Sequence, residues 1–234
     1  MNYSCRAISL LNYKYGEESI IAKIFTEEYG LISYSVKRGR SKKSKNKISL
    51  LQHMSLINIS AQKKQKNEIQ FLKEISLSHS LINSYLNINK QLLRMFMAEV
   101  LEKILVSNEQ DKRLFNFIWN EIILLDTLEK VSSNYALNYL LSITYYLGFY
   151  PSKENIELDF FDLEKASFVE KEDNRGMIIK GENLVFFKSL LINNNNNIPY
   201  KNRKEILKLI LKYYKTHYYN LENIKSFDVI DDMR

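Results

Sequence analysis

Positively charged side chains dominate two short runs in the first third of the chain. Residues 37–47 hold seven bases in eleven positions, and residues 63–66 hold three more. The bases are Lys37, Arg38, Arg40, Lys42, Lys43, Lys45 and Lys47, and then Lys63, Lys64 and Lys66. Lys and Arg neutralise phosphate groups, so both runs are candidate contacts to nucleic acid. The first run is rich in Ser and Asn, and we expect it to form a loop.

Aromatic side chains close to these bases would favour a single strand as the partner. A single strand is held by charge and by bases stacked on aromatic rings, each stack contributing about 1–3 kcal/mol. The candidates are Tyr13, Tyr15, Tyr29, Tyr34 and Phe71, although aromatic residues are also ordinary members of a strand core. Tyr13 and Tyr15 lie at an expected turn, so we expect these two to be exposed. No base-reading helix pattern is present, so we expect sequence-independent contacts.

Signatures of catalysis and of metal binding are missing from the sequence. Neither Gly-x-Gly-x-x-Gly nor Gly-Lys-Ser/Thr occurs, so dinucleotide and P-loop phosphate binding have no support. His53, His79 and His217 lack a second ligand at metal-binding spacing. Cys5 is the single cysteine, which excludes a disulfide framework, and we expect it to lie in a core. We therefore expect a binding protein without cofactor or metal, and not an enzyme.

The net charge of +7 over 234 residues is concentrated at one end of the chain. Residues 1–80 contain fourteen bases and six acids, a local charge of +8, whereas the remaining 154 residues carry −1. Between Glu28 and Glu68 there are ten bases and no acid. A solvated charged loop explains a few lysines but not this segregation, which indicates a polyanionic partner.

Short β-branched and aromatic runs separated by turn residues predict five strands before residue 80. A five-stranded OB-type barrel is the smallest closed arrangement of this length that also offers a nucleic-acid face. The expected strands span residues 6–11, 19–25, 31–36, 54–60 and 69–77.

The period of the apolar residues changes to that of helices after about residue 83. Helices are expected at 84–106, 110–128, 133–147 and 202–216, with a short hairpin pairing 166–170 with 177–180 and then a helical turn. We therefore predict an α+β chain: a basic, nucleic-acid-binding OB-fold over 1–80 and a mostly α-helical domain over 81–234.

One stretch, residues 131–152, carries no charge and approaches the length of a membrane-spanning helix. It nevertheless contains several Ser, Asn and Thr residues, and the mean hydropathy of the chain is −0.31. We expect a buried helix there and no membrane association. The N-terminus shows no basic segment followed by an apolar run, so we expect a cytoplasmic protein.

Four segments, taken in order, resemble the RecO family of bacterial recombination mediators. They are a Gly-Glu turn at 16–17, a Thr-x-Glu-x-Gly hairpin at 26–30, a basic turn at 37–40 and Leu-Gly-Phe-x-Pro at 147–151. The resemblance covers the first 80 residues well and the rest loosely.

The resemblance implies an OB barrel followed by a helical domain, and a nucleoid-associated DNA repair protein. Family members bind single- and double-stranded DNA, anneal complementary strands, and help to load the RecA recombinase together with RecR and the C-terminal tail of single-strand-binding protein. On the matching positions Lys37, Arg38 and Arg40 would contact phosphates. Many members carry a four-cysteine zinc module after the Leu-Gly-Phe-x-Pro segment. Residues 152–182 contain no cysteine, so we expect no zinc here, with packing or the short hairpin in its place.

Two other classes of function stay open at the level of the sequence. An RNA-binding OB module would show the same charge pattern, because phosphate contacts do not distinguish RNA from DNA. A helical scaffold whose basic loop touches anionic lipid is the other alternative.

Overall fold

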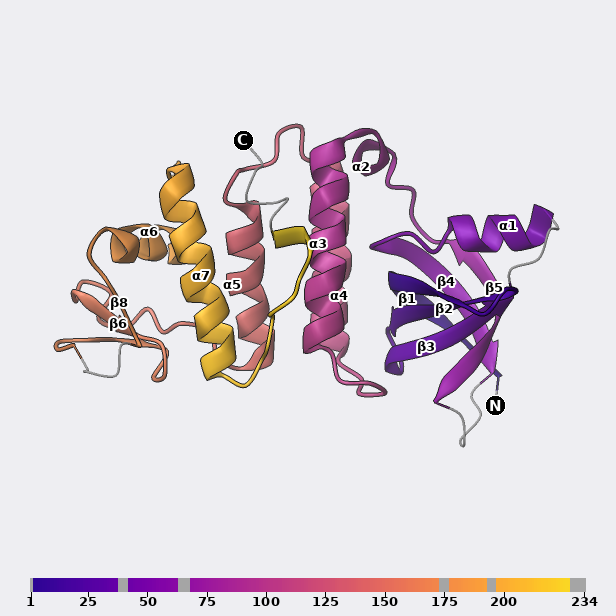
Figure 1. The fold of residues 1–234 in the computed structure, drawn as a ribbon, viewed down its shortest axis with the longest axis horizontal. Coiled ribbons are helices and arrows are strands. Elements are labelled where there is room, and N and C mark those ends of the chain that lie inside the picture. The colour runs from indigo at the N-terminus through magenta and orange to yellow at the C-terminus, as the bar shows by residue number, and fades with distance from the viewer. Residues whose placement is uncertain (1, 38–41, 63–67, 173–176, 193–196, 228–234) are drawn as a thin grey trace. The chain divides into compact units, whose positions relative to one another are not determined.

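The computed structural model describes residues 2–37, 42–62, 68–172, 177–192 and 197–227, without the side chains of 42–45 (Figure 1). The chain forms two compact units, Met1–Glu129 and Lys130–Arg234. The first contains the strands expected before residue 80.

Five strands close into a barrel in the order β1-β2-β3-β5-β4. All neighbouring strands are antiparallel except β3 and β5, which pair in parallel. This confirms the predicted barrel and its five strands. The strands are β1 (Asn2–Tyr15), β2 (Ser19–Thr26), β3 (Gly30–Lys37), β4 (Ser55–Gln62) and β5 (Ile69–Leu77).

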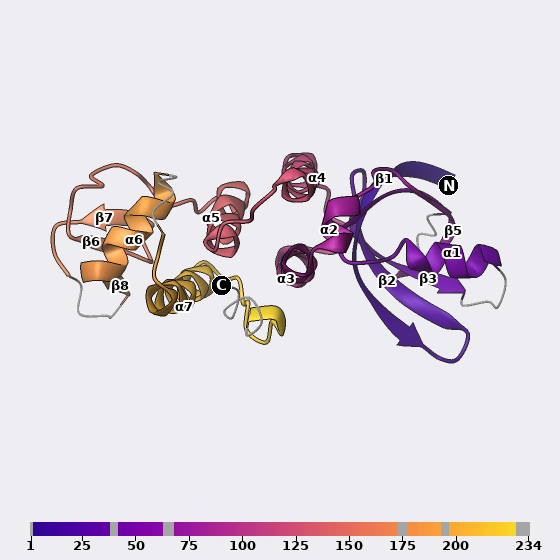
Figure 2. The same cartoon turned by 90° about the horizontal axis from the view of Figure 1, so that it is seen from above.

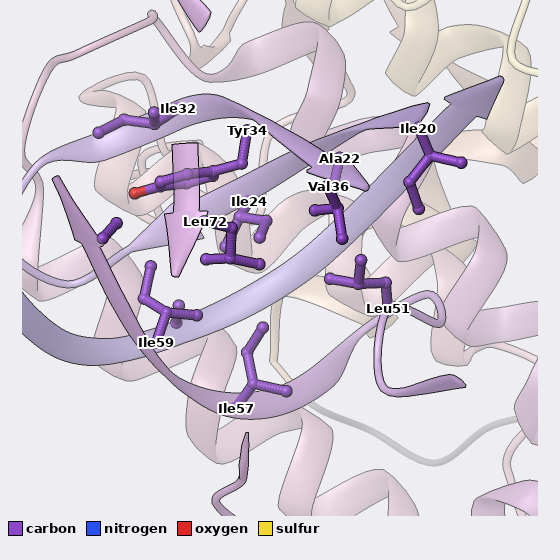
Figure 3. Packing of buried hydrophobic residues seen from close by; sticks show 12 residues of the cluster. Ile20, Ala22, Ile24, Ile32, Tyr34, Val36, Leu51, Ile57, Ile59 and Leu72 are labelled. Atoms are coloured by element: carbon purple, nitrogen blue, oxygen red, sulfur yellow. The ribbon is translucent and has the colours of Figure 1, made fainter. Parts of the chain in front are cut away.

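Alternate residues of the strands fill the barrel, as Figure 3 shows. Ala22 and Ile24 of β2 lie inside with Tyr34 of β3 and Leu72 of β5, and each is almost completely buried. Because side chains alternate between the faces of a strand, the residues between them point outward.

The expectation of a loop over residues 37–47 is wrong for its second half. Residues Lys42–Ser49 form a helix, α1, which is followed by Leu51 in the barrel core. Ile48 and Leu50 also pack against this core. Apolar residues at the end of the basic run therefore anchor the helix, although its composition indicates a loop.

Three helices complete the first unit: α2 (Ile82–Leu86), α3 (Ile88–Ile104) and α4 (Lys112–Thr127). The single helix expected over 84–106 is divided at Asn87, whose side chain accepts a hydrogen bond from the backbone of Lys90 and caps α3. The rings of Phe25 in β2 and Phe115 in α4 meet edge to face, with centroids 5.3 Å apart. This compact unit extends to Glu129 and so contains both the barrel and these helices. The expected domain boundary near residue 80 stays a prediction.

The second unit combines helices with a small antiparallel sheet of order β7-β6-β8 (Figure 2). The predicted pairing of 166–170 with 177–180 is wrong: β7 and β8 each pair with β6, a strand that the sequence pattern does not reveal. The elements are α5 (Tyr135–Leu147), β6 (Phe160–Asp162), β7 (Ser167–Val169), β8 (Ile178–Lys180), α6 (Gly181–Leu191) and α7 (Tyr200–Thr216).

Aromatic rings hold this second unit together. Phe161 of β6 contacts Phe187 of α6 and Tyr213 of α7. Gly148 ends α5 in a left-handed conformation, and the next residue, Phe149, stacks on His217 with ring centroids 4.6 Å apart. The Leu-Gly-Phe-x-Pro segment thus has a structural role: it ends α5 and packs Phe149 on His217. Within the described ranges, no three His, Cys, Asp or Glu residues gather where they could hold a metal ion.

The central part of the uncharged stretch at 131–152 forms α5, Tyr135–Leu147, and seven of its 13 side chains are buried. In the part of the chain that the structure describes, no helix has both the length and the apolar character needed to cross a membrane.

Candidate nucleic-acid interface

The outward residues of β1, β2, β3 and β5 form three rows that run round the closed barrel, and we call these rows the outer face. Residues that pair across neighbouring strands point to the same side, so the strand register defines each row. The rows are Tyr15, Ser19 and Lys37; Tyr13, Ile21, Ser35 and Phe71; and Leu11, Lys23, Ser33 and Ile69.

Three aromatic side chains are exposed on the outer face. Tyr13, Tyr15 and Phe71 are 47%, 60% and 46% exposed. Tyr13 and Phe71 end the second row, three strand spacings or about 14 Å apart along the curved sheet, and so offer two separate platforms for bases. Both predicted tyrosines are therefore accessible.

Two other aromatic candidates pack into the barrel, Tyr34 completely and Tyr29 in part. Tyr34 is completely buried, and burial raises the pKa of its hydroxyl, which is hydrogen-bonded to the hydroxyl of Tyr3. Tyr29 packs on the ring of Tyr3, with centroids 4.5 Å apart. These two residues stabilise the barrel.

Only part of the first basic run falls in described positions. Lys37 is exposed at the end of β3, in the first row of the outer face. Arg38 and Arg40, which follow it in the chain, lie outside the described residues. The backbone of Lys42, Lys43 and Lys45 belongs to α1, but their side chains are not described.

The second basic run, Lys63, Lys64 and Lys66, also lies outside the described residues. The residues that flank it are described. Gln62 pairs with Phe71 in the second row, and Ile69 stands in the third. Both basic runs are therefore joined to strand ends on the outer face.

Lys47 lies away from this face. Its ammonium group donates a hydrogen bond to the backbone carbonyl of Lys73, whose own ammonium donates to Oδ1 of Asn2 at 2.8 Å. Lys47 also lines a cavity of about 640 Å³ between α1 and the strands β4 and β5. Its contacts favour a role in fixing α1 to β5.

Part of the positive charge on the β1 and β2 side of the outer face is neutralised. Lys23 forms an ion pair with Glu102 of α3. Burial raises the pKa of Tyr13, and Glu102 and Glu99 of the same helix raise it further, against the opposite influence of Lys23. Lys23 therefore offers less positive charge to a phosphate group than an unpaired lysine would.

Strand register adds two residues to the site that the sequence alone did not single out as exposed. Phe71 is one aromatic candidate among several in the sequence, and Ile69, which is 37% exposed, gives no signal of its own. The parallel pairing of β3 with β5 brings both beside Ser33 and Ser35. The sequence pattern points the other way, because apolar Ile69 and Phe71 flank the polar Gln70, yet Gln70 and Leu72 are the buried residues.

Comparisons with known proteins agree over the whole chain. The family model described as Recombination protein O N terminal matches residues 1–81, and that described as Recombination protein O C terminal matches residues 86–226. A protein of Azobacteroides pseudotrichonymphae genomovar. CFP2 named DNA repair protein RecO is 29% identical over 98% of both chains. Proteins of the same name from Flavobacterium psychrophilum and Phocaeicola vulgatus are 29% and 28% identical, over 100% and 97% of this chain and 99% and 96% of theirs.

Proposed function

Because this chain belongs to the RecO family of DNA repair proteins, we propose that its barrel binds single-stranded DNA and anneals complementary strands. The observation that carries the proposal is the outer face. The outer face bears the exposed rings of Tyr13, Tyr15 and Phe71, carries Lys37 in its first row, and adjoins the chain flanks of both basic runs.

The proposed mechanism makes and breaks no covalent bond. Lys and Arg displace condensed counterions from two single strands, which lowers the repulsion between them and lets the bases pair. Each ring stacks on a base without base-specific hydrogen bonds, so the binding does not depend on the sequence of the strand. If about six phosphates are contacted, the logarithm of the binding constant falls with the logarithm of salt concentration at a slope of roughly −4.

The proposed protein partners follow from the family and not from contacts within this chain. We propose that the protein acts at the nucleoid, where it works with RecR and with the C-terminal tail of single-strand-binding protein to load RecA. Residues 81–234 carry a net charge of −1, which favours protein partners over DNA for this part of the chain.

Removal of three bases tests the proposed phosphate contacts. Lys37, Arg38 and Arg40 are replaced together by Ala, and binding to a single-stranded oligonucleotide is measured from low to high salt. We expect weaker binding and a salt slope flatter by about 2, because three phosphate contacts are lost.

The control removes the same amount of charge from another part of the chain. It uses three exposed lysines of α7: Lys201, Lys208 and Lys212. Their replacement by Ala should leave the slope nearly unchanged. Equal effects of the two triple variants, or none from the first, would reject the outer face as the site. A parallel competition between matched DNA and RNA oligonucleotides tests the preference for DNA.

A further inference from the structure

A buried arginine without a salt bridge lies in α3, away from the three rows of the outer face. Arg94 is 3% exposed, and its guanidinium group lies over the ring of Tyr85, 4.4 Å from the centroid. One terminal nitrogen donates to the Tyr85 hydroxyl at 3.3 Å, whereas Nε has no hydrogen-bond partner. Within the described part of the chain, no carboxylate forms a salt bridge with Arg94. A buried cation without a salt-bridge partner is costly, so an anion is expected beside it.

A pocket of about 180 Å³ opens beside this arginine. Its polar walls come from two separate parts of the first unit: Gln52 and His53 follow α1, and Tyr85, Gln91 and Arg94 belong to α2 and α3. The Tyr85 hydroxyl is held in place by the Ser55 hydroxyl at 3.1 Å. The pocket thus joins one permanent cation to amide, phenol and imidazole groups.

His53 is the titratable group of this pocket. Burial lowers the pKa of its imidazole, and the neighbouring Arg94 lowers it further, whereas Glu99 opposes this. A neutral imidazole can donate a hydrogen bond to an oxyanion without adding charge. The arrangement of donors on two walls suits a tetrahedral oxyanion better than a planar carboxylate, for which a guanidinium fork alone would serve.

We propose that this pocket binds a phosphate group, with Arg94 as the cation and His53 and Gln52 as hydrogen-bond donors. The phosphate is either a free anion or one unit of a nucleic-acid strand. In the second case the inference rests on the proposed function.

Inorganic phosphate and the ring signals of His53 test the pocket in the full-length protein. Phosphate is titrated against chloride at matched ionic strength, while the imidazole resonances of all three histidines are followed by NMR. We expect a saturable shift of the His53 signals and no matching shift at His79 or His217.

Two substitutions connect the shift to the proposed donors. Arg94→Lys retains the charge but loses the planar fork, and it should weaken phosphate binding about tenfold. Gln52 is exposed, so Gln52→Ala is expected to fold. It therefore tests the pocket even if the arginine variant does not fold. An unmoved His53, or equal phosphate affinity in Gln52→Ala and in every folded Arg94 variant, would overturn the proposal.

A single-stranded oligonucleotide separates the two sources of phosphate. If a strand occupies the pocket, the oligonucleotide shifts the same His53 signals, and Arg94→Lys weakens its binding. If only free phosphate enters, inorganic phosphate shifts the His53 signals and the oligonucleotide does not. A phosphate-dependent shift with full oligonucleotide affinity in the Lys37, Arg38 and Arg40 variant would support the pocket and reject the proposed DNA site.

Discussion

Phe71 shows how a single residue can carry much of the proposed binding. Its ring is almost half exposed at the end of a row that also holds Tyr13, and it lies on the side of the outer face towards which the basic runs lead. An exposed aromatic ring gains little from packing in the free protein, so its removal should affect ligand binding more than folding.

We expect Phe71→Ala to weaken single-strand binding by about 5- to 150-fold, the loss of one stacked base. The salt slope should stay unchanged, because no phosphate contact is removed. Leu77, an apolar residue of the same strand with a similar exposure of 43%, is the matched control. Fluorescence anisotropy with a labelled oligonucleotide measures both variants, and equal affinity of Phe71→Ala and the wild type would argue against stacking at this position.

A second prediction at the residue scale concerns acid stability. Arg6 donates two hydrogen bonds to the Glu27 carboxylate, at 2.9 and 2.7 Å, and this lowers the pKa of Glu27. A lowered pKa in the folded state adds stability above the unfolded value of about 4.3, and this contribution is lost as the pH falls through the folded value.

Glu27→Gln should therefore reduce stability at pH 7 and make its decline between about pH 5 and pH 3 shallower. The control is Glu28→Gln, because Glu28 forms an exposed pair with Lys112 that should contribute little. Urea midpoints at pH 7, 5 and 3.5 measure the effect. A parallel decline in Glu27→Gln and the wild type would show that the pair does not govern acid stability.

At the scale of elements, turn residues and alternating apolar residues were enough to predict all five strands of the barrel. They failed for α1, because Ile48 and Leu50 are fixed by the barrel interior and not by any local preference of the lysine-rich run. They also failed for β6, although β7 and β8, which are equally short, fall within the predicted hairpin strands. Site residues followed the same division: Tyr13 and Tyr15 were recognisable at a turn, whereas Phe71 needed the β3–β5 register.

Gly30 shows how one element depends on another. It begins β3 with a φ of 67°, and a Cβ atom built on it would lie 1.9 Å from the carbonyl oxygen of Glu109. The backbone of Asn108 donates to Leu31 at the same place. The segment after α3 therefore packs directly against the β2–β3 turn.

Gly30→Ala should destabilise the protein by about 3 kcal/mol or more, since a strained φ is combined with a backbone collision. Gly16 isolates the effect of φ alone, because its φ is 64° and no other atom lies within 4 Å of the position that a Cβ would take. Gly16→Ala should cost only about 1 kcal/mol. Thermal unfolding of both variants gives the comparison, and equal losses would show that the Glu109 contact yields without cost.

At the scale of the whole molecule, the positive charge and the proposed DNA contacts belong to the barrel, but the barrel is not the whole of its compact unit. Ile8 and Phe25 lie outside the barrel core and are completely buried. The ring of Phe25 meets Phe115 of α4, and the guanidinium of Arg6 lies 4.9 Å from the ring of Trp119 in the same helix. The helices therefore complete a second apolar layer on the barrel.

This layer predicts that residues 1–80 alone are much less stable than residues 1–129. A fragment ending at 80 would expose Ile8, Leu10 and Phe25, and each fully buried side chain of this kind contributes about 1.5–3 kcal/mol. The longer fragment retains α3 and α4, and should unfold cooperatively and still bind a single-stranded oligonucleotide. Circular dichroism during urea unfolding compares the two. Equal midpoints would place the folding boundary at residue 80 and show that the barrel folds without α2, α3 and α4. A lower midpoint for 1–80 would place the folding boundary after α4.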